Sequence, residues 1–126
     1  MANLTLTASN QALAWLFGLS ATGPSGTLKV ALVTASGTAS AAGTEVAGGS
    51  YARQTLTVAA PTGGATSNAA EILFAGMPAC TVVGVEVWDS AGSPVRFWFG
   101  ALAEARNVDA GDDVRFGAGE LDFTLS

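Results

Sequence analysis

The sequence predicts a mainly β protein, an antiparallel β-sandwich of jelly-roll type with one short N-terminal helix. From residue 27 to residue 125, short alternating or β-branched segments are separated by glycine-rich turns, which is typical of sandwiches. The strand–helix–strand rhythm of a doubly wound nucleotide fold is absent. The 126 residues fit one domain, with a helix over 4–18 and strands over 27–125.

The helical candidate is the segment 4–18. Leu13, Leu16 and Phe17 have the i, i+3, i+4 spacing of one helix face. We expect this face to pack on the sheet of the same chain, and an anchor to another protein is the alternative. The start of the helix is open, because residues 4–7 (LTLT) also alternate as a short strand would.

The remaining elements are short strands and turns. The expected strands are 27–34, 52–59, 71–74, 81–88, 95–102, 113–116 and 120–125. Residues 35–50 are small and polar and predict a long loop, and 61–68 and 89–94 predict turns.

Composition excludes several classes of function. The net charge is −5 and the five basic residues are scattered, so no basic patch for nucleic acid exists. No stretch approaches the roughly 20 apolar residues of a membrane span, and we expect no membrane partner. Only 12% of residues are charged, which suggests that another protein covers part of the surface.

The stretch GTEVAGGSYARQ (43–54) raises the question of a phosphate-binding loop. Such a loop needs a helix after its glycines and usually a lysine, and neither follows here. We expect Gly48 and Gly49 to adopt positive φ before a strand, with Tyr51 and Arg53 at the junction of loop and strand. The interpretation is structural.

We expect no enzyme activity, no cofactor, no metal and no small-molecule substrate. The chain has no histidine, and its one cysteine, Cys80, lies among apolar neighbours and fits a buried position. The carboxylates of Asp109–Asp113 share one turn, where solvated charges are usual. Calcium is the alternative for that turn, although the twelve-position EF-hand pattern is absent.

Five residues are candidates for a partner interface. Alternation places Trp88 opposite its neighbouring valines and Trp98 opposite Phe97 and Phe99, so both tryptophans can lie on outer faces beside Arg96. Tryptophan and arginine are common at interface centres. The alternative is a sheet with two covered faces, or one whose tryptophan face points inward. Trp15 and Phe17 of the helix form the second candidate surface.

The chain resembles small virion proteins of tailed bacteriophages. The stretches that carry the resemblance are WLFG (15–18), VALVT (30–34), GTEVAGGSYARQ (43–54), GGATSNAAEILF (63–74), GAL (100–102) and VDAGDDVRFGAGELDFTL (108–125). They cover nearly the whole chain. A departure lies at VVGVEVWD (82–89), where relatives carry an aromatic-rich segment, so we expect a different contact surface there.

The resemblance implies a non-enzymatic virion component made in the host cytoplasm. Such proteins are often labelled tail fibre or minor tail proteins, and related small β-sandwiches act as capsid cement or decoration proteins. We expect a cement protein on the capsid surface, bound to the major capsid protein and to copies of itself as a dimer or trimer. A minor tail, tail-fibre or baseplate component is the alternative, and a carbohydrate-binding module is the second alternative.

Overall fold

A computed structural model describes residues 2–125, which form one helix and ten strands. The helix α1 spans Leu6–Leu16. The strands are β1 (Ala2–Leu4), β2 (Lys29–Ala35), β3 (Thr44–Glu45), β4 (Gln54–Thr55), β5 (Ala65–Ser67), β6 (Ile72–Phe74), β7 (Cys80–Trp88), β8 (Arg96–Val108), β9 (Val114–Phe116) and β10 (Asp122–Thr124).

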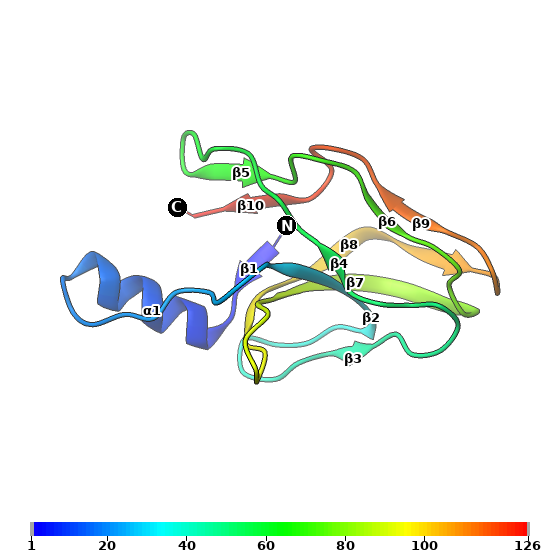
Figure 1. The fold of residues 1–126 in the computed structure, drawn as a ribbon, viewed down its shortest axis with the longest axis horizontal. Helices are drawn as coiled ribbons and strands as arrows, with labels where there is room; N and C mark the ends of the chain where they lie inside the picture. The colour runs from blue at the N-terminus through cyan, green and yellow to red at the C-terminus, as the bar shows by residue number, and fades with distance from the viewer. Residues whose placement is uncertain (1, 126) are drawn as a thin grey trace.

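The strands form a large sheet and a small one (Figure 1). The large sheet has the order β3-β2-β7-β8-β1-β10-β5, with β4 also pairing with β2, and the small sheet is β6-β9. The predicted mainly β fold with one short helix is confirmed, and the arrangement is sandwich-like. One pairing departs from the antiparallel expectation, because β1 runs parallel to β10 where Ala2 faces Phe123.

The core lies between the small sheet and the strands of the large one. Phe74 of β6 and Phe116 of β9 are both about 1% exposed and meet edge to face, with ring centroids 6.3 Å apart. Leu32 of β2 and Val85 of β7 belong to the same apolar cluster. Burying each such side chain stabilises the fold by about 1.5–3 kcal/mol.

The structure contains the predicted antiparallel hairpin of β7 and β8. Its turn lies at 89–94 as expected, but β8 continues to Val108, six residues beyond the predicted end. Gly84 faces Ala101 while Val82 faces Arg106, so β8 carries extra residues between these pairs. They form a bulge that interrupts the alternation on which the sequence prediction relied.

Three short strands lie where the sequence predicted a loop, a turn or a longer strand. β3 lies within 35–50, β5 lies within 61–68, and only Gln54–Thr55 of the expected strand 52–59 pairs as a strand. These two- and three-residue strands have too few residues to show a period of two. Their pairing is set by neighbours distant in sequence, such as Phe123 opposite Thr66.

Helix α1 begins at a capped residue next to the sheet. The hydroxyl of Thr5 accepts a hydrogen bond from the Ala8 N–H at 3.1 Å and donates one to the Arg96 carbonyl at 2.8 Å. The residues before it form β1, whereas the short strand considered at residues 4–7 is not formed, because Leu6 and Thr7 belong to the helix. From Thr5 the helix extends to one end of the molecule, outside the layers of strands (Figure 1).

Candidate interaction surface

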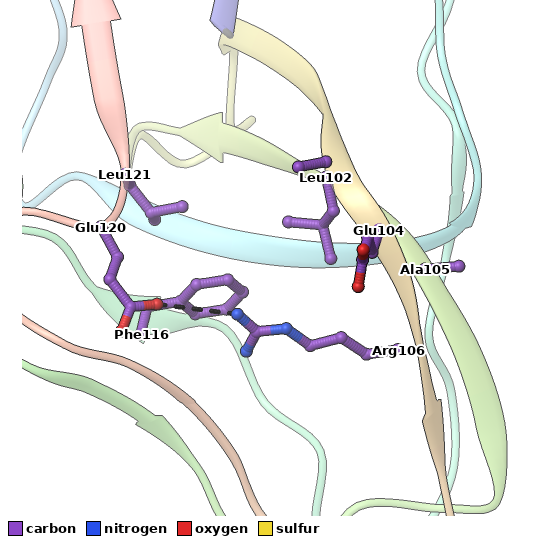
Figure 2. Close-up of a pocket in the computed structure, with 8 residues that line it drawn as sticks. Leu102, Glu104, Ala105, Arg106, Phe116, Glu120 and Leu121 are labelled. Atoms are coloured by element: carbon purple, nitrogen blue, oxygen red, sulfur yellow. Dashed lines mark ion pairs between the residues drawn. The ribbon is translucent and has the colours of Figure 1, made fainter.

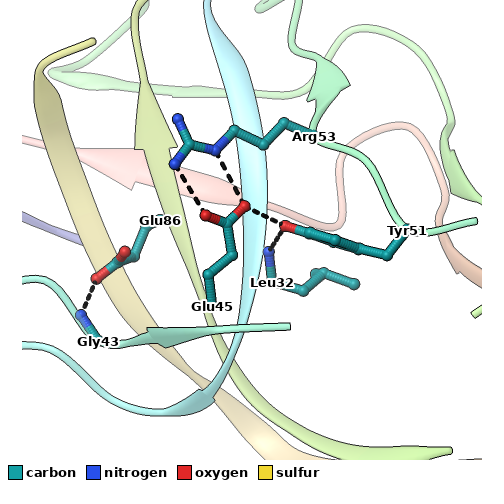
Figure 3. A network of polar contacts seen from close by, with 6 residues as sticks. All are labelled: Leu32, Gly43, Glu45, Tyr51, Arg53 and Glu86. Carbon is teal, nitrogen blue, oxygen red and sulfur yellow. Dashed lines mark hydrogen bonds and ion pairs between the residues drawn. The ribbon is translucent and has the colours of Figure 1, made fainter. Parts of the chain in front are cut away.

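The stretch 43–54 builds a polar network along the edge of β2 (Figure 3). Arg53 donates two hydrogen bonds to the Glu45 carboxylate, from Nε at 3.0 Å and from Nη2 at 2.8 Å. The Tyr51 hydroxyl donates to Glu45 at 2.7 Å and accepts from the Leu32 N–H at 3.0 Å. Tyr51 thereby supplies a partner for a β2 amide between the short strands β3 and β4, so its role here is structural.

Ionisation in this network follows its hydrogen bonds. Burial raises the pKa of Glu45, but the hydrogen bonds from Arg53 and Tyr51 outweigh burial and hold that pKa below its usual value. Burial and the bond to Glu45 raise the pKa of the Tyr51 phenol. The bond to Glu45 also raises the pKa of Arg53. The carboxylate and the guanidinium therefore remain charged at neutral pH.

The two glycines of this stretch have the positive φ expected of them, 107° at Gly48 and 56° at Gly49. Gly49 also lies against a neighbouring loop. A β-carbon there would lie 2.7 Å from the Gly76 carbonyl oxygen and 2.9 Å from the Pro78 nitrogen. Glycine is therefore required for both backbone conformation and space.

Arg96 lies inside the protein instead of on an outer face. It is 8% exposed, and its Nη1 lies 3.1 Å from Oε2 of Glu86, whose side chain is 2% exposed. Glu86 also accepts a bond from the Gly43 N–H at 2.8 Å (Figure 3). The loop around Thr38 and Gly43 covers this face of the hairpin, so this sheet face is covered and Arg96 cannot contact a partner.

Trp88 and Trp98 are half-buried by contacts within the chain. The guanidinium of Arg53 lies 4.4 Å from the centre of the Trp88 ring, and Trp98 meets Phe123 edge to face at 5.2 Å. Both rings are therefore partly used for internal packing. The three residues proposed as one patch, Trp88, Arg96 and Trp98, do not form a common exposed surface.

An open hollow lies beside the bulge of β8 (Figure 2). It measures about 380 Å³ and contains Leu102, Arg106 and Glu120 among its lining residues. Arg106 lies over Phe116, 4.5 Å from the ring centre, and its Nη2 is 3.6 Å from Oε2 of Glu120. Arg106 and Glu120 thus pair across the hollow, and Glu104 adds a second carboxylate to its lining.

Two carboxylates of the acidic turn near residue 110 accept hydrogen bonds from backbone amides, one within the turn and one in a neighbouring loop. Oδ2 of Asp112 accepts a bond from the Asp109 N–H at 3.3 Å, and Asp113 accepts one from Gly76 at 3.2 Å. Across residues 2–125, no group of three or more histidine, cysteine, aspartate or glutamate residues is arranged to hold a metal ion. Cys80 is half-buried, and burial raises the pKa of its thiol.

The largest exposed apolar surface lies on α1 and the residues that follow it. Trp15 is 73% exposed, Phe17 77% and Leu16 67%, while Leu13 and Leu19 are also exposed. The only residue that the helix buries is Ala8. The expectation that Leu13, Leu16 and Phe17 pack on the chain's own sheet is therefore wrong, because small alanines face the body and the large side chains face outward.

A groove separates the far half of α1 from the strands. It measures about 290 Å³ and is mostly apolar, with Ala8 and Trp15 of the helix on one side and Pro24 and Trp98 on the other. None of its lining residues is charged. The helix and this groove together form the surface best suited to contact another protein.

Sequence analysis missed the groups that support the network. It did not single out Glu45, Glu86 or the buried Asn68, which bonds the Gly117 carbonyl and the Leu121 N–H. Glu45 lay in a segment predicted to be a loop, and Glu86 in a strand whose valines dominated the pattern. The exposed apolar surface of the helix did have a signal in the sequence, because residues 2–28 contain no charged side chain.

A comparison with known families identifies the family of this chain. Residues 3–124 match the family described as Podophage GP4 fiber I protein gp80. The chain belongs to this family. The gp80 family match supports a structural phage virion protein and agrees with the resemblance to tailed-phage virion proteins. No curated protein matches the chain closely enough to count. Within residues 2–125, no helix is long and apolar enough to span a membrane.

Proposed function

We propose that this member of the gp80 family is a structural subunit of a tail or fibre assembly on the virion. The observation that carries the proposal is the match to a fibre-protein family along residues 3–124. The site geometry agrees with a binding role. Arg53 and Glu45 of the 43–54 network pair with each other, as do Arg106 and Glu120 in the hollow, while the exposed apolar helix is available for contact.

Capsid cement is the second candidate. The described residues form a small β body without a long shaft, and a body of this kind can bind a lattice of major capsid protein through many modest contacts. In this role the apolar surface of α1 would contact the capsid. The two candidates differ in copy number, because a lattice has hundreds of equivalent sites and a tail has few.

Quantitative gel densitometry of purified virions, combined with immunogold labelling, tests the proposal. We expect a ratio of a few copies per hundred major capsid subunits, with gold at the tail vertex. A ratio near one, or a simple fraction of one, with gold over the whole head would replace the fibre role with the cement role. A virion without the protein would refute both.

A further inference from the structure

Helix α1 carries no charged side chain. The first charged side chain after Ala2 is Lys29, so neither the helix nor the following loop carries a charge. A large exposed apolar patch on a protein marks a contact with another molecule. In the isolated chain α1 buries Ala8 alone, while Leu6, Leu13, Leu16 and Phe17 are more than half exposed. The cover for this helix is therefore another molecule.

The outward side chains form a stripe suited to a second helix. Leu6, Leu13 and Leu16 are separated by seven and three residues, the spacing of the apolar positions in a coiled coil. Phe17 follows directly beside them, and the small Ser9 occupies the remaining position of the repeat. We call Leu6, Leu13, Leu16 and Phe17 the outer stripe. Trp15 lies on the opposite side, above the groove.

We propose that copies of this chain associate with one another through the outer stripe, α1 against α1. The inference rests on the proposed structural role, because a fibre subunit works by repetition. An apolar stripe is complementary to itself, as the contact between identical subunits requires.

Charge favours a second copy as the partner. All ten acidic and five basic residues lie beyond residue 28, so copies that each carry a net charge of −5 can meet at the stripe without opposing charged side chains there. A charged partner surface would find no complementary group on α1. Depletion of charge together with exposed aromatic residues is typical of interface cores.

The exposed area sets the scale of the contact. Each residue of the outer stripe is more than half exposed, and a large apolar side chain buries on the order of 100 Å², so the stripe presents a few hundred Å². A standard interface buries roughly 800 Å² on each partner, so the stripe supplies the apolar centre of such a contact and neighbouring residues complete it. An exposed patch of this extent is unusual for a protein that works alone.

Light scattering coupled to size-exclusion chromatography tests the inference on the purified full chain. We expect a dimer or trimer for the natural sequence. Leu13→Glu and Leu16→Glu are expected to weaken association by roughly ten- to hundred-fold or more, because a carboxylate would be buried in the contact. Both positions are exposed in the single chain and glutamate favours helices, so the fold is retained; far-UV circular dichroism checks this.

Leu125→Glu is the matched control, since Leu125 is 57% exposed and Leu13 is 54% exposed. It is expected to leave the oligomer intact. A monomeric natural protein, folded stripe variants that still associate, or equal dissociation by Leu125→Glu would each overturn the inference. These outcomes are independent of where virion labelling places the protein, so the proposed function can fail separately.

Discussion

At the scale of single residues, the fold depends on a few charged and polar groups that act on the backbone. Glu45, Tyr51 and Arg53 close the gap between β3 and β4, and Glu86 with Arg96 fixes the covering loop to the hairpin. Each of these groups has its hydrogen bonds completed only while its partner is present. Removing one partner therefore lowers the free energy of unfolding by more than the net contribution of the hydrogen bond.

Tyr51→Phe isolates the hydroxyl of the first network. The variant keeps the ring, which stacks on Phe74 at 6.0 Å, but leaves the Leu32 N–H and one Glu45 bond without their partner. The expected loss in the free energy of unfolding is about 1–3 kcal/mol, measured by urea denaturation. A loss close to zero would show that water replaces the hydroxyl.

Arg96→Leu tests the buried ion pair. Glu86 would remain as an unpaired buried carboxylate, and the expected loss is about 3–5 kcal/mol. The double variant Arg96→Leu with Glu86→Leu removes the unpaired charge and is expected to recover much of this loss. Denaturation of both variants decides the point, and a double variant as unstable as the single one would contradict it.

The pH dependence of stability follows from Glu45. Its pKa is lower in the folded chain than the ordinary value of 4.5, so its contribution is fully present above about pH 4.5. The contribution is lost as the pH falls through the lower folded pKa. The difference in Tm between the natural protein and Glu45→Gln should therefore shrink on acidification below pH 4.5. Glu104→Gln, at an exposed position, is the control and should show no comparable difference at any pH.

At the scale of elements, a helix or strand could be predicted where residues close in sequence determine it, and not where a distant strand does. The β7–β8 hairpin follows from β-branched residues and a turn close in sequence, and the prediction placed it correctly. Strand β5 depends on β10, more than fifty residues away, and no local pattern indicates it. The spacing of Leu13, Leu16 and Phe17 predicted the helix correctly, but periodicity identifies a face without telling which molecule covers it.

Gly49→Ala tests the turn between β3 and β4. The β-carbon would meet the Gly76 carbonyl at 2.7 Å in addition to the positive φ of 56°. Gly63→Ala is the matched control, with a φ of 62° and no atom within 4 Å. We expect both variants to lose about 1 kcal/mol from backbone strain, and Gly49→Ala to lose clearly more. Thermal unfolding of the pair measures the difference, and equal losses would show that the loop at Gly76 moves aside.

At the scale of the whole molecule, β1 connects the two parts of the large sheet. It lies between β8 and β10, with Asn3 opposite Phe99 and Ala2 opposite Phe123. The mainly β fold was predicted, but the helix start was placed at residue 4. Strand β1 was not predicted, because three residues give no periodicity. The predicted interface patch around Arg96 is not exposed because a loop covers Arg96. That loop is held by hydrogen bonds between residues distant in sequence, which no local pattern indicates.

A charge placed in β1 should destabilise the entire fold. Ala2→Glu would bury a carboxylate at a position that is 7% exposed, at an expected cost of at least about 2 kcal/mol. Asn3→Glu changes the adjacent, exposed residue and should have little effect. Tryptophan fluorescence during urea denaturation measures both variants. Similar stability of the two would mean that β1 contributes little to the sheet.

The place of β1 also has a consequence for biosynthesis. Ala2–Leu4 is synthesised before its partners in β8 and β10, which lie far along the chain. The large sheet therefore cannot close before β10 has been synthesised. Until then the uncharged segment from Ala2 to Leu28 has no finished sheet beside it, so its apolar side chains are open to aggregation during folding.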